Sequence, residues 1–287
     1  MTVFVGLVTH RETRYPESRG ESGLVHQVHQ ALENRGISSQ VHVFDEDLWS
    51  DAVLDIDRSV VERSIQAELS TEKAWRVYHG NRWPRPLLDL AFGIRSLRRR
   101  ATFEGLTRRS RSRGYAMVRR LVNIELAHVH LMRQAVLDGS TWALIVEDDA
   151  HGDAVSTASV IERIVRTEIY HNQPAYVNLS RSFTHQRLGV TDGLAVVNDG
   201  SKFAGGTAFL RSDKPVTNTV CAIFYRTSFL ASLLENLESK PLDPVIPIDW
   251  KINAGLMEMA ESKAIQPGDA WLCEEPPVIQ GSMHQPE

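Results

Sequence analysis

Hydrophobic and polar positions along the chain alternate in blocks that predict an α/β protein. Residues 3–8 are a run of mostly β-branched and apolar side chains, which is typical of a buried strand. Apolar residues at helical spacing follow over 24–34, with Gly36 as a stop signal, and a second strand is expected at 41–44. A strand, a helix and a strand in this order form a βαβ unit, which predicts a parallel sheet.

The remaining pattern predicts one large domain. We expect strands at 142–146, 175–179 and 219–225, and helices at 57–74, 122–137, 155–170, 228–237 and 249–261. Helix breakers interrupt the pattern at 81–86, and the tail from Pro267 is expected to wrap over the fold in extended form. The prediction is a single domain over 1–287: a Rossmann-like, mainly parallel sheet flanked by helices, with a helical, basic insertion at about 51–118.

Composition narrows the class of protein. A chain of 287 residues with 42% hydrophobic residues can bury a sizeable core. Its two cysteines, Cys221 and Cys273, have neither CxxC nor zinc-type spacing, which fits a reducing compartment. The sequence shows neither a signal-peptide pattern nor the roughly 18–20 apolar residues of a membrane span. We expect a cytoplasmic protein, either free or attached peripherally to the inner face of the membrane.

Arginines are concentrated between Arg95 and Arg120, where ten of them accompany a single acid, Glu104. Such a stretch is usually a solvated helical face, and it also suits an anionic partner. An RNA-binding segment would normally add aromatic platforms or an RNP-type signature, which this one lacks. We therefore expect a phosphorylated acceptor or an anionic membrane surface as the partner, and no nucleic acid.

Three consecutive carboxylates, Glu147, Asp148 and Asp149, follow the strand expected at 142–146. Because like charges repel, this acidic run needs water or a cation. Ligands of α/β sheets bind at the carboxyl ends of strands, and adjacent carboxylates suit Mg²⁺ or Mn²⁺ held together with phosphate oxygens. The run could instead cap the following helix, since acids are favoured in a first helical turn. The motif alone leaves both interpretations open.

The surroundings of the acidic run resemble the glycosyltransferases of family 25, the lipopolysaccharide and collagen sugar transferases. Ala127 and His128 lie on a helix at the place of the family's Ser-His, and the apolar strand then ends in Glu-Asp-Asp at 147–149. A second block is similar to a later part of the family: a strand and helix over 220–234, followed by Pro-Ile-Asp at 247–249.

This resemblance implies a GT-A fold, a Mn²⁺ or Mg²⁺ ion, a nucleotide-sugar donor with UDP favoured, and a glycan or glycolipid acceptor. Asp149 would bind the metal, together with His284 returning from the tail. Asp148 would contact the ribose or sugar, and Glu147 would support both. Asp249 would be the general base of an inverting transfer. Asp249 also precedes an expected helix, so a plain N-cap is the alternative.

The loop after the first strand holds the nucleotide in proteins of this fold. The resemblance therefore places Thr9, His10 and Arg11 at the base and ribose, and Arg11 or Arg14 at the diphosphate. It also places His128 among the donor-binding residues. A solvated loop is the alternative for residues 9–14.

Two other functions stay open. One is a binding protein that keeps this fold without catalysis. The other is a nucleotidyltransferase on a similar fold, which usually has a glycine-rich, basic loop after the first strand. Residues 20–23, Gly-Glu-Ser-Gly, are acidic and do not fit such a loop.

Overall fold

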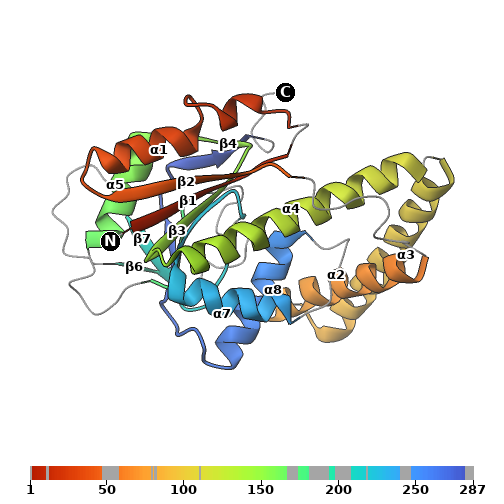
Figure 1. The fold of residues 1–287 in the computed structure, drawn as a ribbon. Helices are drawn as coiled ribbons and strands as arrows, with labels where there is room; N and C mark the ends of the chain where they lie inside the picture. The colour runs from red at the N-terminus through yellow and green to blue at the C-terminus, as the bar shows by residue number, and fades with distance from the viewer. Residues whose placement is uncertain are drawn as a thin grey trace.

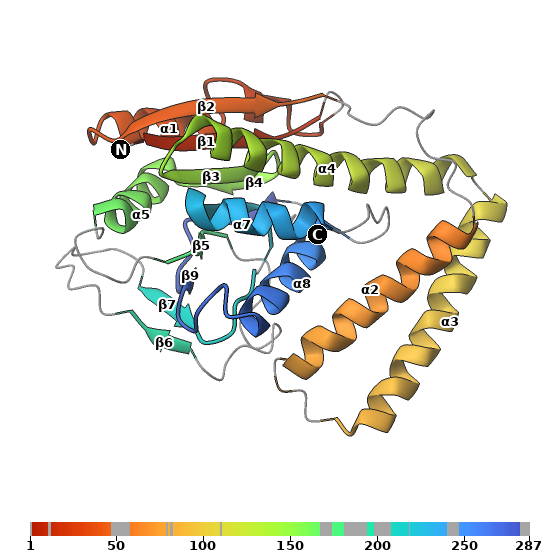
Figure 2. The ribbon, with the colours of Figure 1, turned by 60° about the horizontal axis from the view of Figure 1, so that its bottom comes forward.

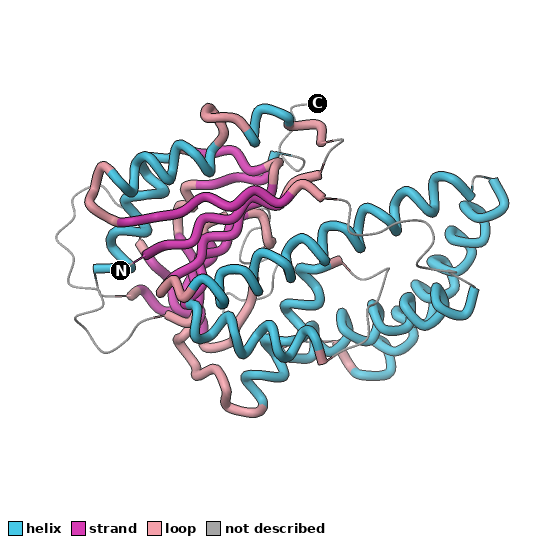
Figure 3. The backbone as a smooth tube through the Cα atoms, viewed as in Figure 1, coloured by secondary structure: helices cyan, strands magenta, loops and turns pink. Residues whose placement is uncertain are grey.

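The computed structural model describes residues 2–10, 13–46, 58–78, 80, 83–109, 111–166, 174–180, 194–197, 208–217, 219–239 and 247–281, with the backbone alone at 58–65, 67, 68 and 99–120. Within these ranges an eight-stranded sheet lies between two layers of helices (Figures 1 and 3). Its strands are β1 (Thr2–Val8), β2 (Ser38–Phe44), β3 (Trp142–Glu147), β5 (Tyr176–Asn178), β6 (Leu194–Val196), β7 (Phe209–Ser212), β8 (Ala222–Arg226) and β9 (Ala270–Cys273).

The sheet is mixed, with the order β2-β1-β3-β8-β5-β9-β7-β6. β1 is parallel to both β2 and β3, and β5 is parallel to β9. β8 runs antiparallel to β3 and β5, and β7 runs antiparallel to β9 and β6. Only β7 and β8 of the described strands therefore oppose the common direction. The α/β class is confirmed, and the arrangement is compatible with a Rossmann-like fold.

Two helices cover one face of the sheet and three cover the other. α1 (Leu24–Glu33) and α5 (Ala154–Arg166) pack over one apolar layer, while α4 (Arg111–Asp138), α7 (Thr227–Glu238) and α8 (Ile248–Glu261) pack over the second. β1 is buried on both faces, which is why its sequence reads as a continuous apolar run. The expected βαβ unit over β1, α1 and β2 is confirmed.

Aromatic side chains fill the core on both sides of β3. Trp142 stacks on Phe224 with ring centroids 4.9 Å apart and an interplanar angle of 9°, and both rings are fully buried. Leu131 and Met132 of α4 meet Leu230 of α7 in the second layer. A fully buried side chain of this size contributes about 1.5–3 kcal/mol to stability. The core thus holds the carboxyl edge of β1 and β3 in a fixed place.

Two long helices lie to one side of the sheet, outside the two helical layers that cover it. α2 (Arg58–Tyr78) and α3 (Arg85–Arg109) form a hairpin, with α2 between α3 and α8 (Figure 2). The helix expected at 122–137 begins earlier, at Arg111, so the basic segment runs directly into a helix that packs on the sheet. No helix in the described part of the chain is long and apolar enough to cross a membrane.

The expectation for the tail was wrong in one respect. Residues from Pro267 were expected to wrap over the fold, whereas β9 lies inside the main sheet between β5 and β7. The four residues of β9 are all buried, but they are too few to stand out among flanking Pro, Glu and Gln. Further on, β10 (Val278–Gln280) pairs antiparallel with β4 (Ala150–Gly152).

Candidate functional site

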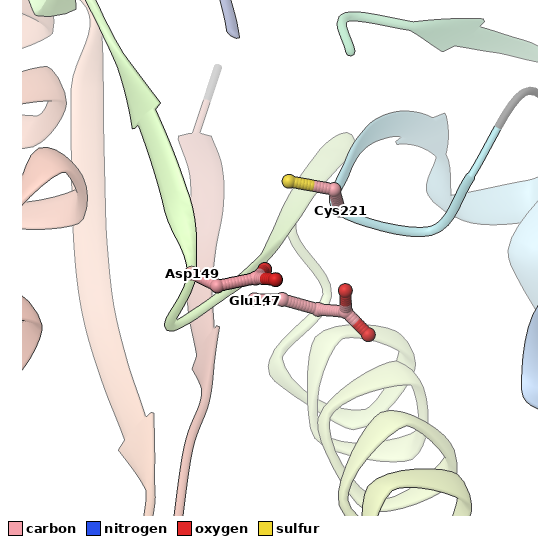
Figure 4. A group of neighbouring side chains, drawn as sticks. All are labelled: Glu147, Asp149 and Cys221. Carbon is pink, nitrogen blue, oxygen red and sulfur yellow. The ribbon is translucent and has the colours of Figure 1, made fainter. Parts of the chain in front are cut away.

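The acidic run lies at the carboxyl edge of β3, where the strand ends and a turn begins. Glu147 is the last residue of β3, and Asp148 and Asp149 form the turn into β4. Figure 4 shows Glu147 and Asp149 extending to the same side of this turn. Asp148 is bonded instead to the loop after β1, through Thr9 and Thr13. Glu147 and Asp149 therefore form a pair of carboxylates, and Asp148 has a separate orientation.

Asp148 anchors the loop that follows β1. Its Oδ2 accepts hydrogen bonds from the hydroxyl of Thr9, at 3.1 Å, and from the hydroxyl of Thr13. Arg19 donates to the carbonyl oxygen of His10 and lies 3.5 Å from Asp45. β1 and β3 are parallel neighbours, so the end of β1 lies beside Asp148 and the loop is fixed to it.

Glu147 is held by a histidine from α4. Nε2 of His128 lies 3.2 Å from Oε1 of Glu147, and His128 is only 1% exposed. An ionised carboxylate only accepts hydrogen bonds, so Nε2 is the donor. His130, two residues further along the helix, instead packs its ring against Phe44 at 4.5 Å. The structure thus brings His128 to the acidic run.

Glu147, Asp149 and Cys221 form a group that could hold a metal ion. One ligand atom from each lies within 4.8 Å of the others, and Figure 4 shows the Cys221 side chain close to the two carboxylates. Burial raises the pKa of the Cys221 thiol well above its usual range, and the charges of Glu147, Asp149 and Asp148 raise it further. Because the thiol stays protonated, the two carboxylates are the stronger ligands, and they suit Mg²⁺ or Mn²⁺.

Asp249, in the first turn of α8, is within the electrostatic influence of Glu147 and His128. Burial raises the pKa of its carboxyl group to about 6, and the Glu147 charge adds to this rise. The Trp250 N–H and the charge of His128 oppose it. Nearby, a Lys251–Glu125 ion pair, whose side chains are 13% and 12% exposed, joins α8 to α4. Asp249 lies inside the first turn, since Pro247 is the N-cap, so the simple N-cap interpretation was wrong.

The C-terminal segment closes over the acidic run. The N–H of Gly281 donates to the carbonyl oxygen of Asp149 at 2.7 Å. A side chain at Gly281 would collide there, because an added Cβ would lie 2.4 Å from the His151 ring and 2.9 Å from that oxygen. His151 also makes an edge contact with Tyr15, at 5.6 Å between centroids. The loop after β1, the acidic run and the tail are therefore in contact.

A cavity of about 140 Å³ lies beside Glu147 and Asp148. Its opposite wall is the turn η1 (Pro16–Arg19) and the start of α1. Gly23, the N-cap of α1, provides no side-chain cap, so backbone N–H groups of the first helical turn remain as donors. Such a helix start favours anions. The cavity thus has the carboxylates of Glu147 and Asp148 on one wall and a helix start without a side-chain cap on the other.

The helix-capping interpretation of the acidic run was wrong. The following helix, α5, begins at Ala154 and is capped by the carboxylate of Asp153, which accepts from the N–H groups of Val155, at 3.1 Å, and Ser156, at 3.2 Å. β4 separates this cap from the acidic run. The three carboxylates are therefore not used to begin a helix.

The expected site residues divide into three groups. Brought together by the fold are Thr9, His128, Glu147, Asp148, Asp149 and Asp249. His10 takes part through its backbone, and Arg14 is exposed in the turn between Thr13 and Tyr15. Arg11 and His284 lie outside the described residues.

Sequence reasoning missed several residues of this site. Thr13, Cys221 and Gly281 all contact the acidic run, yet each is far from it in sequence. The position of Thr13 could have been recognised from the sequence, because it lies in the loop that was expected at the carboxyl end of β1. Cys221 and Gly281 carry no local signal of this kind.

The sequence matches no protein-family model, and no curated protein matches it. What the structure establishes is the class of site: a carboxylate cluster at the carboxyl edge of a mixed α/β sheet, next to a helix start. A function must be argued from this geometry.

Proposed function

We propose that this chain is a metal-dependent glycosyltransferase of the GT-A type. It would move a sugar from a nucleoside-diphosphate donor, with UDP-sugars favoured, to a hydroxyl of a glycan or glycolipid acceptor, with inversion. The observation that carries the proposal is the convergence of three elements. His128 of α4 contacts Glu147 at the end of β3, and the charge of Glu147 acts on the carboxyl group of Asp249 in α8. Such a meeting of titratable groups is typical of a reaction site.

The donor fits the edge formed by β1, β3 and α1. Glu147 and Asp149 would hold Mn²⁺ or Mg²⁺, which when bound offsets the negative charge of the diphosphate leaving group. The first turn of α1 can donate N–H groups to phosphate oxygens from across the cavity. The loop containing Thr9 and Thr13, fixed by Asp148, would place the nucleoside.

Asp249 is suited to take the proton from the acceptor hydroxyl as that oxygen attacks the anomeric carbon. Its pKa of about 6 leaves it ionised at neutral pH and more basic than an ordinary aspartate. The Glu147 charge that helps to raise this pKa belongs to the same cluster. In this arrangement Glu147 serves both the metal and the base.

Nucleotide binding is tested by thermal unfolding of the protein with UDP, GDP and their sugars, each with and without Mn²⁺. A ligand at a hundred times its Kd adds about 2.7 kcal/mol to the stability of the native state. We expect metal-dependent stabilisation by one nucleotide class and its loss in Asp149→Asn. Asp213→Asn is the matched control, since Asp213 is exposed and follows β7 at the opposite edge of the sheet.

Catalysis is tested by release of nucleoside diphosphate from the donor identified in this way, with Asp249→Asn as the variant. Retained nucleotide binding with lost turnover would support the role of Asp249 as base. No stabilisation by any nucleotide, with metal present and the protein folded, would contradict the transferase proposal. Stabilisation without turnover on any sugar donor or acceptor would favour a binding protein that keeps this fold.

A further inference from the structure

The outer helix of the hairpin, α3, carries an apolar stripe that no other described segment of the chain covers. Leu87, Leu90, Ile94 and Leu97 are between 48% and 67% exposed. Their spacing of three, four and three residues places all four on one face of the helix. Trp83, just before the helix, is 60% exposed as well. We call these five side chains the α3 stripe.

The opposite face of α3 packs against α2. Leu88 is buried, Arg95 pairs with Glu72 of α2 at 2.5 Å, and Asp89 pairs with Lys73. At 100° per residue these positions lie on the far side of the helix from the stripe. α2 in turn packs on α8, where Trp75 meets Trp250 at 6.0 Å between centroids. Figure 2 shows the same order, with α3 outermost.

The stripe is too long to be ordinary surface. Single exposed apolar residues are common, whereas a contiguous row of large ones marks an interaction surface. Interior packing cannot explain it either, because the packed face of α3 points the other way. Among the described residues, then, the α3 stripe is a surface open to a partner.

Charge indicates the nature of that occupant. Residues 82–100 contain six arginines and one acid, Asp89. Asp89 pairs with Lys73 and Arg95 pairs with Glu72 of α2, so the segment keeps an excess of positive charge. A helix with Trp and Leu on one side in a basic segment is typical of binding in the plane of an anionic membrane. Trp is also favoured at the boundary between lipid and water. A second copy of the chain fits less well, because it would bring two arginine-rich helices together over a heptad pattern only about two repeats long.

We propose that α3 docks on an anionic lipid surface, with the α3 stripe inserted among the acyl chains at the lipid–water boundary and the arginine-rich segment 82–100 held there by the negative headgroups. This inference stands on α3 alone and does not depend on the proposed catalytic activity. The lipid would supply both things that this face requires, an apolar layer and negative charge.

The test is co-sedimentation of the whole protein with phosphatidylcholine vesicles, and with the same vesicles containing phosphatidylglycerol. We expect binding only to the anionic vesicles, weakened by salt. Leu90→Gln/Leu97→Gln should reduce binding roughly tenfold or more while unfolding at the same temperature, because both side chains are exposed. The matched control is Leu137→Gln/Val155→Gln, whose side chains are 75% and 58% exposed on other helices; it should bind as the wild type does.

Three outcomes would overturn the proposal. The first is a wild-type protein that stays in the supernatant with anionic vesicles. The second is equal binding by the α3 double variant, which would place membrane contact elsewhere. The third is a concentration-dependent dimer that the α3 substitutions abolish in the absence of vesicles, which would make a second copy the occupant.

Discussion

The ring of His128 and the carboxylate of Glu147 are 3.2 Å apart and join α4 to the end of β3. A buried hydrogen bond to a charged group contributes about 1.5–3 kcal/mol. It also fixes the direction of a side chain that belongs to the carboxylate pair. The position of Glu147 thus depends on α4, the helix that precedes β3 in the chain and packs on the sheet.

His128→Leu should therefore weaken the site more than it weakens the fold. Without its donor, Glu147 is no longer oriented, so we expect Mn²⁺-dependent stabilisation by nucleotide to fall by about 1–2 kcal/mol. His130→Leu is the control, since His130 packs on Phe44 and does not contact Glu147. Thermal unfolding with and without ligand measures both effects. An equal response in the two variants would mean that the histidine acts only in packing.

Asp249 should make stability depend on pH in a specific direction. Its pKa is about 6 in the folded protein against an ordinary value of 3.8, so its contribution to stability is fully present below 3.8 and is lost as the pH rises through 6. Asp249→Asn removes the cost of burying the charge and should stabilise the protein at pH 8, by at most about 3 kcal/mol. Little gain should remain at pH 4. Denaturant unfolding at both pH values checks this, and an unchanged or lower stability at pH 8 would contradict it.

Activity should also follow the ionisation of Asp249. If this carboxylate is the base, kcat/KM for transfer should rise with pH through about 6 and then level off. The rising limb should disappear with Asp249→Asn, leaving only residual turnover. A profile with the same limb in the variant would assign the ionisation to another group.

The hydroxyl of Thr13 should matter for ligand binding because it ties the loop after β1 to Asp148. Thr13→Val keeps the shape of the side chain but removes the donor. We expect nucleotide affinity to fall by about tenfold, which corresponds to one hydrogen bond of about 1.4 kcal/mol. Thr13→Ser restores a hydroxyl and should recover most of the affinity. Calorimetric titration distinguishes the two, and equal affinities would show that the bond does not position the loop.

Gly281 should be intolerant of any side chain. In Gly281→Ala the new Cβ would lie within 2.9 Å of both the His151 ring and the Asp149 carbonyl oxygen, so β10 must move away from β4. We expect easier proteolysis of the C-terminal segment and a loss of about 1–3 kcal/mol. Gly93→Ala in α3 meets nothing within 4 Å and should instead stabilise by about 0.5–1 kcal/mol. Equal stability of the two variants would contradict the close packing at Gly281.

Much of the fold could be predicted because its longer strands and helices have recognisable local sequence patterns. Continuous apolar runs identified β1 and β3, helical spacing identified α1, and the stop at Gly36 and the strand after it completed the βαβ unit. The acidic run was found for the same reason, since its position depends only on where β3 ends. The strands that were missed, β4, β6, β7, β9 and β10, have three or four residues each, too few to show a period.

The sequence by itself determined the α/β class, the place of the acidic run at a strand end and the excess of arginine near α3. Only the tertiary structure decided which residues meet that run. Thr13 and Asp148 are 135 positions apart, and the tail reaches Asp149 through Gly281. Likewise, the raised pKa of Asp249 and the uncovered α3 stripe depend on what packs nearby. Local periodicity records which face of an element is apolar, and it holds no information about which distant segment will cover that face.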